Sequence, residues 1–372
     1  MAKALNEEET EKTKQIFNQT GNVTEAAAIL GISRRAMQHR LDDINKKDKK
    51  FSAPKLPSSL PTIEELLEQR TAQGDRSIAA DEARKLITVN VHIDGPFGLW
   101  VWGDPHVDDD GCDMRLLRSH VELAKHPYIT SGHIGDVANF WVGRLARLYA
   151  HQSTSVHEAI MLCEWLLTQH ENLFVVLGNH DLWNGGGLEN PINWILRHAG
   201  GVTEDHGVRL ALKQPCGTIT RVNARHTFPG MSQYNVNHGM RRELAFGHRD
   251  HILVSGHLHS GSDQAVCNDG NGMVSQLVRV SGYKVVDHYA KQLNFPPQKI
   301  HPSALIIIDP REPETSRARA WVAPSVEIGV KLLDAMRADF EASKEKSGDV
   351  KKAKLRINKP QPTRRRNTRR AI

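Results

Sequence analysis

Between residues 86 and 325, short apolar runs typical of buried strands alternate with stretches of helical periodicity. The strand-like runs are Leu86–Ile93, Gly98–Trp102, Leu173–Leu177, Ile252–Ser255 and Ala304–Ile308, and the helical stretches include 113–126 and 153–170. This alternation favours an α/β fold, because helices between strands return the chain to a shared sheet. We expect an α/β core from about 86 to 325 and a last helix at about 325–342.

A separate helical segment precedes the core. Within residues 7–44, apolar side chains fall at helical spacing on one face, namely Ile16, Phe17, Ala26, Ala27, Leu30, Ile32, Met37 and Leu41. Asn22 and Glu25 predict a capping box, Gly31 a helix end, and Ser33 the cap of a third helix that runs to about Asp43. A short helix, a glycine turn and a second short helix predict a helix-turn-helix over 1–44.

The parts that flank the core differ from it in charge. Residues 45–85 predict a linker, with three prolines within 45–61, and a connecting helix at 62–72. Residues 344–372 carry a balance of +10, residues 1–55 carry +3, and residues 56–343 carry −7. We expect the basic tail, 343–372, to be disordered alone, the termini to meet polyanions, and the middle to hold a carboxylate-rich site.

The composition excludes some classes of protein. No run approaches the roughly 18 apolar residues of a membrane span, and the first residues lack the apolar stretch of a secretory signal. The cysteines, Cys112, Cys163, Cys216 and Cys267, form no CxxC pair, so the sequence indicates neither a thiolate zinc site nor a compact disulfide framework. We expect a cytoplasmic protein that does not bind membranes.

Five short polar motifs stand out within the core. They are Asp104-Pro-His106, Gly135-Asp136, Gly178-Asn179-His180-Asp181, His226, and Gly256-His257-Leu258-His259. Two follow apolar strands directly, and the carboxyl ends of strands are where loops converge on ligands in α/β sheets. Carboxylate, amide and imidazole ligands together suit manganese, iron or zinc. A pair of such ions needs a bridging carboxylate.

In this order the motifs resemble the calcineurin-like metallophosphoesterase superfamily over roughly residues 98–260. The successive spacings from Asp104 to Asp136, Asn179, His226 and His257 are 32, 43, 47 and 31 residues. The resemblance implies a four-layer α/β/β/α sandwich over 86–342 and two divalent metal ions, with Mn²⁺ preferred and iron or zinc as alternatives. It assigns one metal to Asp104, His106, Asp136 and His259, and the other to Asp136, Asn179, His226 and His257.

The resemblance also implies roles beside the metals. His180 matches the histidine that protonates the leaving oxygen or steadies the phosphate, with Asp181 orienting it, and Asn139 matches a position near the metals or the substrate. The implied reaction is in-line attack on phosphorus by a water that the metals activate, without a protein nucleophile.

Some positions leave alternatives open. His226 is followed by Thr227 rather than the frequent glycine, so His238, which does precede a glycine, is the alternative ligand, and His206 is more remote. Asp108–Asp110 are three consecutive carboxylates, which favours a solvated loop over a cation site. Trp141 and Trp183 each follow a metal motif, where they would stack on a base or pack at a cleft rim.

Residues 21–41 resemble the helix-turn-helix of the factor-for-inversion-stimulation type, on Gly21-Asn22, Ala26-Ala27, Gly31-Ile32 and Leu41. This resemblance implies that the third helix enters the major groove of DNA, with contacts from Arg34, Arg35, Gln38 and Arg40. A helical hairpin for protein docking is the alternative. A metallophosphoesterase fused to such a segment resembles phage or prophage enzymes of DNA metabolism.

The leading hypothesis is therefore a metal-dependent DNA phosphodiesterase, a nuclease with its own DNA-binding segment. A phosphomonoesterase or small-molecule phosphodiesterase keeps the chemistry and changes the substrate. A DNA-binding regulator with an idle phosphoesterase fold is the non-enzymatic alternative. The sequence leaves open the oligomeric state and the choice between endonuclease and exonuclease.

Overall fold

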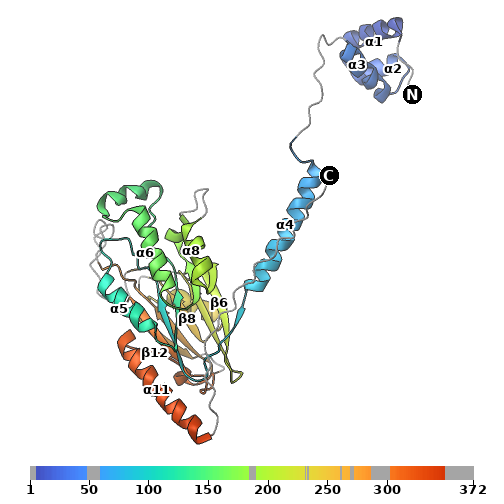
Figure 1. Cartoon of the computed structure of the whole chain (residues 1–372). Coiled ribbons are helices and arrows are strands. Elements are labelled where there is room, and N and C mark those ends of the chain that lie inside the picture. The colour runs from blue at the N-terminus through green and yellow to red at the C-terminus, as the bar shows by residue number, and fades with distance from the viewer. Residues whose placement is uncertain are drawn as a thin grey trace, which may run out of the picture. The chain divides into compact units, whose positions relative to one another are not determined.

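The computed structural model describes residues 6–47, 59–183, 190–230, 232, 234–259, 262–268, 272–285 and 302–347. It is a mixed α/β protein with two six-stranded sheets, shown in Figure 1. The chain divides into two compact units, residues 1–74 and 75–372. None of the described helices is both long and apolar enough to cross a membrane.

The first unit contains a small bundle of α1 (Glu7–Thr20), α2 (Val23–Ile29) and α3 (Arg34–Lys47). Asn6 and Glu9 form a capping box at the start of α1, and Asn22 caps α2 through the Thr24 N–H. Ser33 Oγ accepts from Ala36 N–H at the start of α3, as predicted. The core of this three-helix bundle consists of Ala26, Ala27, Met37 and Leu41, with Ile16, Phe17, Val23, Leu30 and Ile32 packed against them.

Helix α4 (Ile63–Arg84) ends at Arg84 rather than at the predicted residue 72, and the boundary between the units falls within it. Gly74 lies inside the helix, and a single exposed glycine weakens a helix without ending it. None of its side chains is buried.

Sheet B has the order β12-β11-β2-β3-β4-β5. Its strands are β2 (Phe97–Trp102), β3 (Ile129–His133), β4 (Asn172–Leu177), β5 (Val202–Asp205), β11 (Ser303–Ile308) and β12 (Ala320–Val322). Strands β2 to β5 run parallel, and β11 and β12 extend the sheet antiparallel. Two polar side chains of β3 are satisfied inside the protein, by the bond from Ser131 Oγ to Asn172 Oδ1 at 2.9 Å and the bond from Thr130 Oγ1 to the carbonyl oxygen of Glu171 at 3.1 Å.

Sheet A has the order β1-β6-β7-β8-β10-β9 and mixes parallel with antiparallel pairs. Its strands are β1 (Ile87–Asn90), β6 (Gly207–Lys213), β7 (Ile219–Arg225), β8 (Ile252–Ser255), β9 (Asp263–Asn268) and β10 (Val274–Arg279).

The main core lies between the two sheets. It joins Leu99 and Val101 of β2 to Val222 of β7 and Val254 of β8. The alternate residues of β2, Trp100 among them, face a second core, because successive side chains of a strand point to opposite faces.

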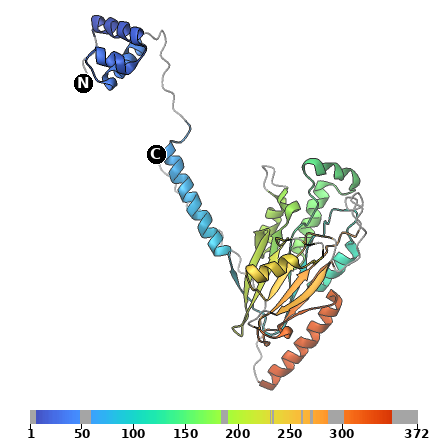
Figure 2. The ribbon, with the colours of Figure 1, turned by 180° about the vertical axis from the view of Figure 1, so that it is seen from behind.

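Helices complete the second core on the outer face of sheet B. They are α5 (Met114–Ala124), α6 (Val156–Thr168), α8 (Pro191–Ala199) and α11 (Val326–Ser347), and Figure 1 shows α5, α6 and α11 beside the sheet. Helix α9 (His238–Phe246) packs through Met240 on Leu253 and Leu277 of sheet A, and is yellow in Figure 2. The remaining short elements are the 3-10 helices η1 (Gly143–His151) and η2 (Arg317–Arg319) and helix α7 (Asn179–Trp183).

Predicted boundaries also shift at α3 and α11. Helix α3 continues to Lys47, so the predicted linker begins later than residue 45. Helix α11 continues to Ser347, so the first residues of the predicted basic tail are helical, and 348–372 lie outside the described residues.

Candidate metal centre

The predicted ligands lie just beyond the carboxyl ends of five strands. Strand β2 ends before Asp104, β3 before Asp136, β4 before Asn179, β7 before His226 and β8 before His257. Three of these strands belong to sheet B and two to sheet A. Loops from both sheets therefore place the predicted ligands at one end of the two-sheet core.

Asp104, His106 and His259 form one group whose ligand atoms lie within 4.8 Å of one another. The Nε2 atoms of His106 and His259 are 3.2 Å apart, and Asp104 Oδ1 is 4.0 Å from His259 Nε2. Asp104 and His106 are buried. The group could hold a metal ion, because a carboxylate and two imidazoles offer oxygen and nitrogen ligands at one point.

Asp136, His226 and His257 form a second such group. His226 Nε2 lies 3.3 Å from Asp136 Oδ2, 2.9 Å from His257 Nδ1 and 2.9 Å from Asn179 Oδ1. A third group, His106, Asp136 and His180, overlaps both of the others. The seven predicted ligands therefore converge, and Asp136 is shared between two groups.

His226, rather than His238 or His206, lies in this cluster. His226 is buried, and its Nδ1 donates to the carbonyl oxygen of Ile134 at 2.8 Å, which directs Nε2 toward Asp136. His238 begins α9 and is exposed, and His206 is exposed as well. Neither belongs to a ligand group among the described residues.

The backbone is strained where the ligands lie. Among the non-glycine residues with positive φ are Asp104 at 47°, His106 at 41°, Asp136 at 57° and His257 at 71°. Such conformations are uncommon for residues with a Cβ and concentrate at functional sites, where the surrounding structure holds them. Each of these four residues is a predicted metal ligand.

Two glycines let the ligand loops approach one another. A Cβ at Gly178 would lie 2.3 Å from Asp136 Oδ1 and 2.8 Å from His226 Cε1. A Cβ at Gly256 would lie 2.3 Å from Asp104 Oδ2. Both contacts are too short for any side chain, so these positions require glycine for steric reasons.

Asp181 is fully buried, and its oxygens accept from the backbone N–H groups of Gly178, Asp136 and Val137 at 2.7–3.0 Å. The predicted orienting contact between Asp181 and the His180 ring is therefore wrong. Asp181 instead holds together the loops that carry Asp136 and Asn179.

His180 Nδ1 donates to the carbonyl oxygen of Asn139 in a short hydrogen bond. The ring is enclosed by aromatic side chains, with centroids 4.2 Å from Trp183, 5.0 Å from Trp141 and 4.9 Å from His106. Both tryptophans that follow the metal motifs thus lie against His180. A backbone carbonyl only accepts, so the Nδ1 atom carries a proton and Nε2 is the nitrogen left for chemistry.

The Asn139 side chain is buried, and its Nδ2 donates to Asp109 Oδ2 at 2.9 Å and to Gln152 Oε1 at 3.2 Å. Asp108 is also buried, and it accepts from Asn139 N–H and from Gln152 Nε2. The prediction of a solvated loop for Asp108–Asp110 is therefore wrong for Asp108, because two donors replace its water.

Two buried basic side chains, Lys284 and Arg279, lie near the predicted ligands and were not predicted from the sequence. Lys284 Nζ lies 2.8 Å from Asp109 Oδ2. Arg279 donates to the carbonyl oxygens of Val236 and Leu258, at 2.9 Å and 3.5 Å, and so contacts the loop that carries His257 and His259. Neither residue belongs to a recognisable sequence motif. Tertiary contacts alone bring each of them to the site, so no local pattern could have predicted it.

Burial opposes the ionised form of the carboxyl groups at the site. It raises the pKa of the Asp104 carboxyl to about 7 against the charge of His226. Burial and the charge of Asp136 raise the pKa of Asp181 to about 7. Burial opposes ionisation of Asp136 as well, but the hydrogen bond and charge of His226 lower its pKa to about 2. Such a cluster of buried carboxyl groups favours bound cations.

In the first unit, Arg34, Arg35 and Gln38 are exposed on α3, and Gln38 Nε2 donates to Asp42 Oδ1 at 3.1 Å. Arg40 is half-buried. At about 100° per residue it lies on the opposite side of the helix from Gln38, so it does not share one surface with the other three.

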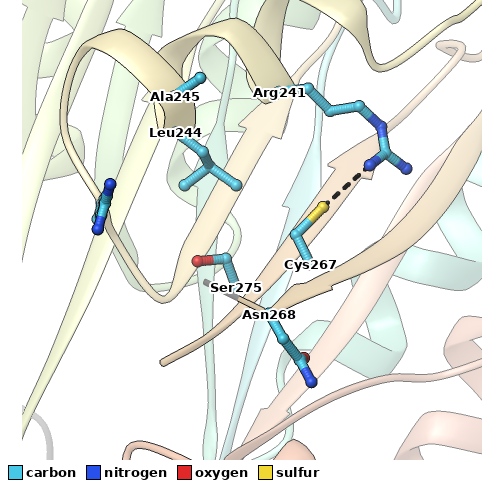
Figure 3. Close-up of a pocket in the computed structure, with 7 residues that line it drawn as sticks. Arg241, Leu244, Ala245, Cys267, Asn268 and Ser275 are labelled. Atoms are coloured by element: carbon cyan, nitrogen blue, oxygen red, sulfur yellow. Dashed lines mark hydrogen bonds between the residues drawn. The ribbon is translucent and has the colours of Figure 1, made fainter. Parts of the chain in front are cut away.

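A surface pocket of about 280 Å³ lies away from the ligands, between α9 and strands β9 and β10. Figure 3 shows Arg241 donating to Cys267 Sγ, at 3.2 Å, with Leu244, Ala245, Asn268 and Ser275 around them. No residue of the predicted site lines this pocket, so the proposed chemistry is not located there.

No family model matches the chain, and no curated protein matches it. Similar solved structures include a protein of unknown function from Aquifex aeolicus, 17% identical with a TM-score of 0.26, which covers 44% of this chain and 80% of that one. A Thermotoga maritima protein is 10% identical with a TM-score of 0.28, covering 61% and 97%. GAP50, the anchor in the inner membrane complex of Plasmodium, is 8% identical with a TM-score of 0.32, covering 65% and 95%.

Proposed function

We propose that the protein is a metal-dependent phosphodiesterase of the calcineurin-like metallophosphoesterase type, and that it cleaves DNA. The observation that carries this proposal is the pair of ligand groups, Asp104–His106–His259 and Asp136–His226–His257, which the third group links through His106 and Asp136. Two adjacent ligand groups joined by one carboxylate are what a pair of divalent cations about 3.5–4 Å apart requires.

The donor atoms fit such ions. Asp104 Oδ1 is a buried atom without a hydrogen-bond partner among the described residues. An unpartnered buried carboxylate oxygen is costly, and a cation would compensate it. The oxygen and imidazole donors suit Mn²⁺, iron or zinc. Asp104, His106, Asp136 and His259 would hold one ion, and Asp136, Asn179, His226 and His257 the other.

When bound, the two ions supply an activated water and neutralise charge on the phosphoryl oxygens. The protein's own contribution is to hold the donor atoms in place and to handle the leaving group. Asp181 fixes the backbone of the Asp136 and Asn179 loops. His180, whose Nδ1–H is held by the backbone carbonyl of Asn139, presents Nε2 to the leaving group. When both ring nitrogens are protonated, the Nε2 proton is the one that would pass to the leaving oxygen, which leaves the neutral ring with its proton on Nδ1.

The rim of the site is suited to a nucleotide. Trp141 and Trp183 enclose His180, and both are only partly buried. Aromatic rings beside a phosphate site offer stacking surfaces for bases, worth about 1–3 kcal/mol for each base. This arrangement favours a nucleotide-containing phosphodiester over a small inorganic or alkyl ester.

The helical bundle of the first unit supports DNA as the substrate. Its α3 exposes Arg34, Arg35 and Gln38, residue types that contact phosphates and base edges in the major groove. We propose that this bundle is a helix-turn-helix of the factor-for-inversion-stimulation type, and that it brings DNA to the phosphodiesterase.

The proposal includes a four-layer sandwich for the second unit. Two facing sheets share the main core, and helices α5, α6, α8 and α11 cover sheet B. On sheet A, the described cover is the short helix α9 at one side. The fourth layer is therefore much thinner than the first.

The experiment is a metal and substrate panel on the full chain. Metal-free protein would be loaded with Mn²⁺, Fe²⁺ or Zn²⁺, its bound metal counted, and its action on linear DNA, single-stranded DNA, RNA and p-nitrophenyl phosphate measured. Two bound ions and cleavage of DNA are expected, and Asp136→Asn should abolish both. Turnover of the nitrophenyl ester with intact DNA would make the protein a phosphomonoesterase. DNA binding without any turnover would make it a regulator.

A further inference from the structure

Lys284 is a buried lysine that the proposed reaction does not yet use. Its backbone lies in a short antiparallel bridge with Cys112. Hydrogen bonds on either side, from Asp113 N–H to Tyr283 O at 2.8 Å and from Val285 N–H to Gly111 O at 2.9 Å, fix this segment. The lysine is therefore held against the loop that follows His106.

The Lys284 ammonium group pairs with Asp109 inside the protein. Their side chains are 2% and 18% exposed, and the Nζ–Oδ2 distance is 2.8 Å. Nζ also lies 5.4 Å from the ring centroid of Trp141. A lysine loses much of its hydration energy at such a position, so its placement indicates a specific role for the charge rather than a surface ion pair.

Asp109 connects this lysine to Asn139. The same oxygen, Asp109 Oδ2, accepts from Lys284 Nζ and from Asn139 Nδ2 at 2.9 Å. Asp108 holds Asn139 from the other side by accepting its backbone N–H at 2.8 Å. Two neighbouring carboxylates therefore fix one asparagine, and Lys284 balances the charge of Asp109.

Asn139 in turn holds His180. The backbone carbonyl oxygen of Asn139 accepts the Nδ1 proton of His180. The position of this oxygen therefore determines both the tilt of the imidazole and which of its nitrogens is protonated. The polar contacts thus run without a break from Lys284 through Asp109 and Asn139 to the ring. Trp141 lies near both ends of this connection, with its ring centroid 5.4 Å from Lys284 Nζ and 5.0 Å from the His180 ring centroid.

We propose that Lys284 and Asp109 are positioning residues that act through Asn139 to hold the His180 imidazole with Nδ1 protonated and Nε2 toward the leaving group. The inference rests on the proposed function for the role of His180. The positioning itself is a property of the protein that can be measured without any substrate. A general acid contributes only when its proton lies within hydrogen-bond reach of the leaving oxygen, so a small tilt is costly.

The first test observes the His180 ring directly. Full-length protein labelled with ¹⁵N-histidine and loaded with diamagnetic Zn²⁺ would be compared with Lys284→Met and Asp109→Asn by long-range ¹H–¹⁵N correlation, with His180→Gln used for assignment. The wild type should show protonated Nδ1, and both variants a mixture of tautomers or an altered Nδ1 signal. An unchanged His180 signal in both variants would overturn the proposal.

The second test uses the leaving group. Rates would be measured for the p-nitrophenyl and phenyl esters of thymidine 5′-phosphate, because nitrophenolate leaves without a proton and phenolate needs one. Lys284→Met and Asp109→Asn should lower kcat for the phenyl ester by about 10- to 100-fold, and that for the nitrophenyl ester by about threefold or less. KM and bound metal should stay near the wild-type values.

Three controls separate positioning from general damage. Lys125→Met removes the surface pair of Lys125 with Glu122, which are 2.7 Å apart, and should change neither ester. Lys284→Arg keeps the charge and should recover part of the loss. Combining Lys284→Met with Asp109→Asn should cost little more than either change alone, because both act through one contact. Equal losses on the two esters would make the pair merely structural. Wild-type protein inactive on both esters would refute the proposed function, while the His180 signal would still decide the inference.

Discussion

His226 donates its Nδ1 proton to the carbonyl oxygen of Ile134, 2.8 Å away, and thereby ties the end of β7 in sheet A to the loop that follows β3 in sheet B. Ile134 lies two residues before Asp136, which His226 approaches with its other nitrogen at 3.3 Å. This hydrogen bond therefore links the two sheets at the site, and the Ile134 carbonyl fixes the tautomer of the His226 imidazole. A backbone carbonyl behind a metal-binding histidine commonly serves this purpose.

If the proposed function holds, His226→Gln should lose one of the two proposed metal ions and most of the activity. The glutamine cannot reproduce both the bond to Ile134 and the approach to Asp136, Asn179 and His257. His238→Gln is the matched control, because His238 is exposed at the start of α9 and should keep both ions. Metal counting by plasma mass spectrometry on both variants checks the assignment. Loss of metal from the His238 variant alone would reverse it.

His180→Gln and Asp136→Asn should have different effects on metal content. His180 has its Nδ1 bound to Asn139, and in the proposed mechanism it handles the leaving group, so its loss should keep both ions and lower kcat by about 10²- to 10⁴-fold. Asp136 is shared by two ligand groups, so its loss should remove both ions. Isothermal titration with Mn²⁺ and rates on DNA would be measured together. Equal metal loss in the two variants would make His180 a ligand.

Gly178→Ala should weaken metal binding without a change in any ligand. The new Cβ would lie 2.3 Å from Asp136 Oδ1 and 2.7 Å from the Asp136 backbone nitrogen, so the Asp136 carboxylate must move. We expect a loss of about 10- to 100-fold in affinity, as for other changes that displace a ligand. Gly74→Ala is the control, because a Cβ there meets nothing within 4 Å, and it should stabilise α4 by roughly 1 kcal/mol.

The residues of the candidate metal groups could be predicted from the sequence because each motif follows a strand, and in every motif except that of His226 an adjacent glycine marks a sharp turn. Gly178 and Gly256 follow the apolar strands β4 and β8, where this signal is strongest. The sequence also favoured His226 over His238, since His226 closes β7. Local sequence patterns of this kind predict where a strand ends and which side chain follows it.

Contacts between residues that are far apart in the chain could not be predicted from the sequence. Lys284 follows β10 without a motif, and only the fold brings it to Asp109. Asp108 belongs to a run of three carboxylates, which in isolation favours solvent, yet the donors that bury it come from Asn139 and Gln152. The assignment of Asp181 failed for the same reason, because its partners are backbone groups that no sequence pattern specifies.

Acid should destabilise the second unit through His251. Burial and the charge of Arg221 lower the pKa of His251 to about 4, with a smaller opposing effect from Glu314. Its Nδ1 accepts the Arg221 N–H at 2.9 Å, and a proton at Nδ1 would break that bond. Because the pKa is lower in the folded protein than in the unfolded chain, the neutral ring stabilises the fold above about pH 6.5, and this contribution falls as the pH drops toward 4.

The loss should be on the order of 3 kcal/mol between pH 7 and pH 4. Urea unfolding of the wild type and of His251→Gln, measured across this range, isolates the contribution, because other titrating groups are common to both. The glutamine variant should be less stable than the wild type at pH 7 and close to it near pH 4. Parallel stability curves for the two proteins would show that His251 does not titrate differently on folding.

DNA binding by the first unit should depend on one side of α3. Arg34 and Arg35 are exposed, whereas Arg40 is half-buried on the opposite side from Gln38. The double change Arg34→Ala and Arg35→Ala in the full chain should weaken binding to duplex DNA, and lower the slope of log affinity against log salt by about 2 if both contact phosphates. Arg40→Ala should have a smaller effect.

These affinities would be measured by fluorescence anisotropy at several salt concentrations with His180→Gln present throughout, so that cleavage does not interfere. The comparison between Arg40→Ala and the double variant is the informative one, because all three side chains carry the same charge and differ in which side of α3 they occupy. Equal effects at all three positions would indicate attraction by net charge alone. Unchanged affinity in the double variant would favour a protein-docking role for the bundle and leave DNA recognition to other parts of the chain.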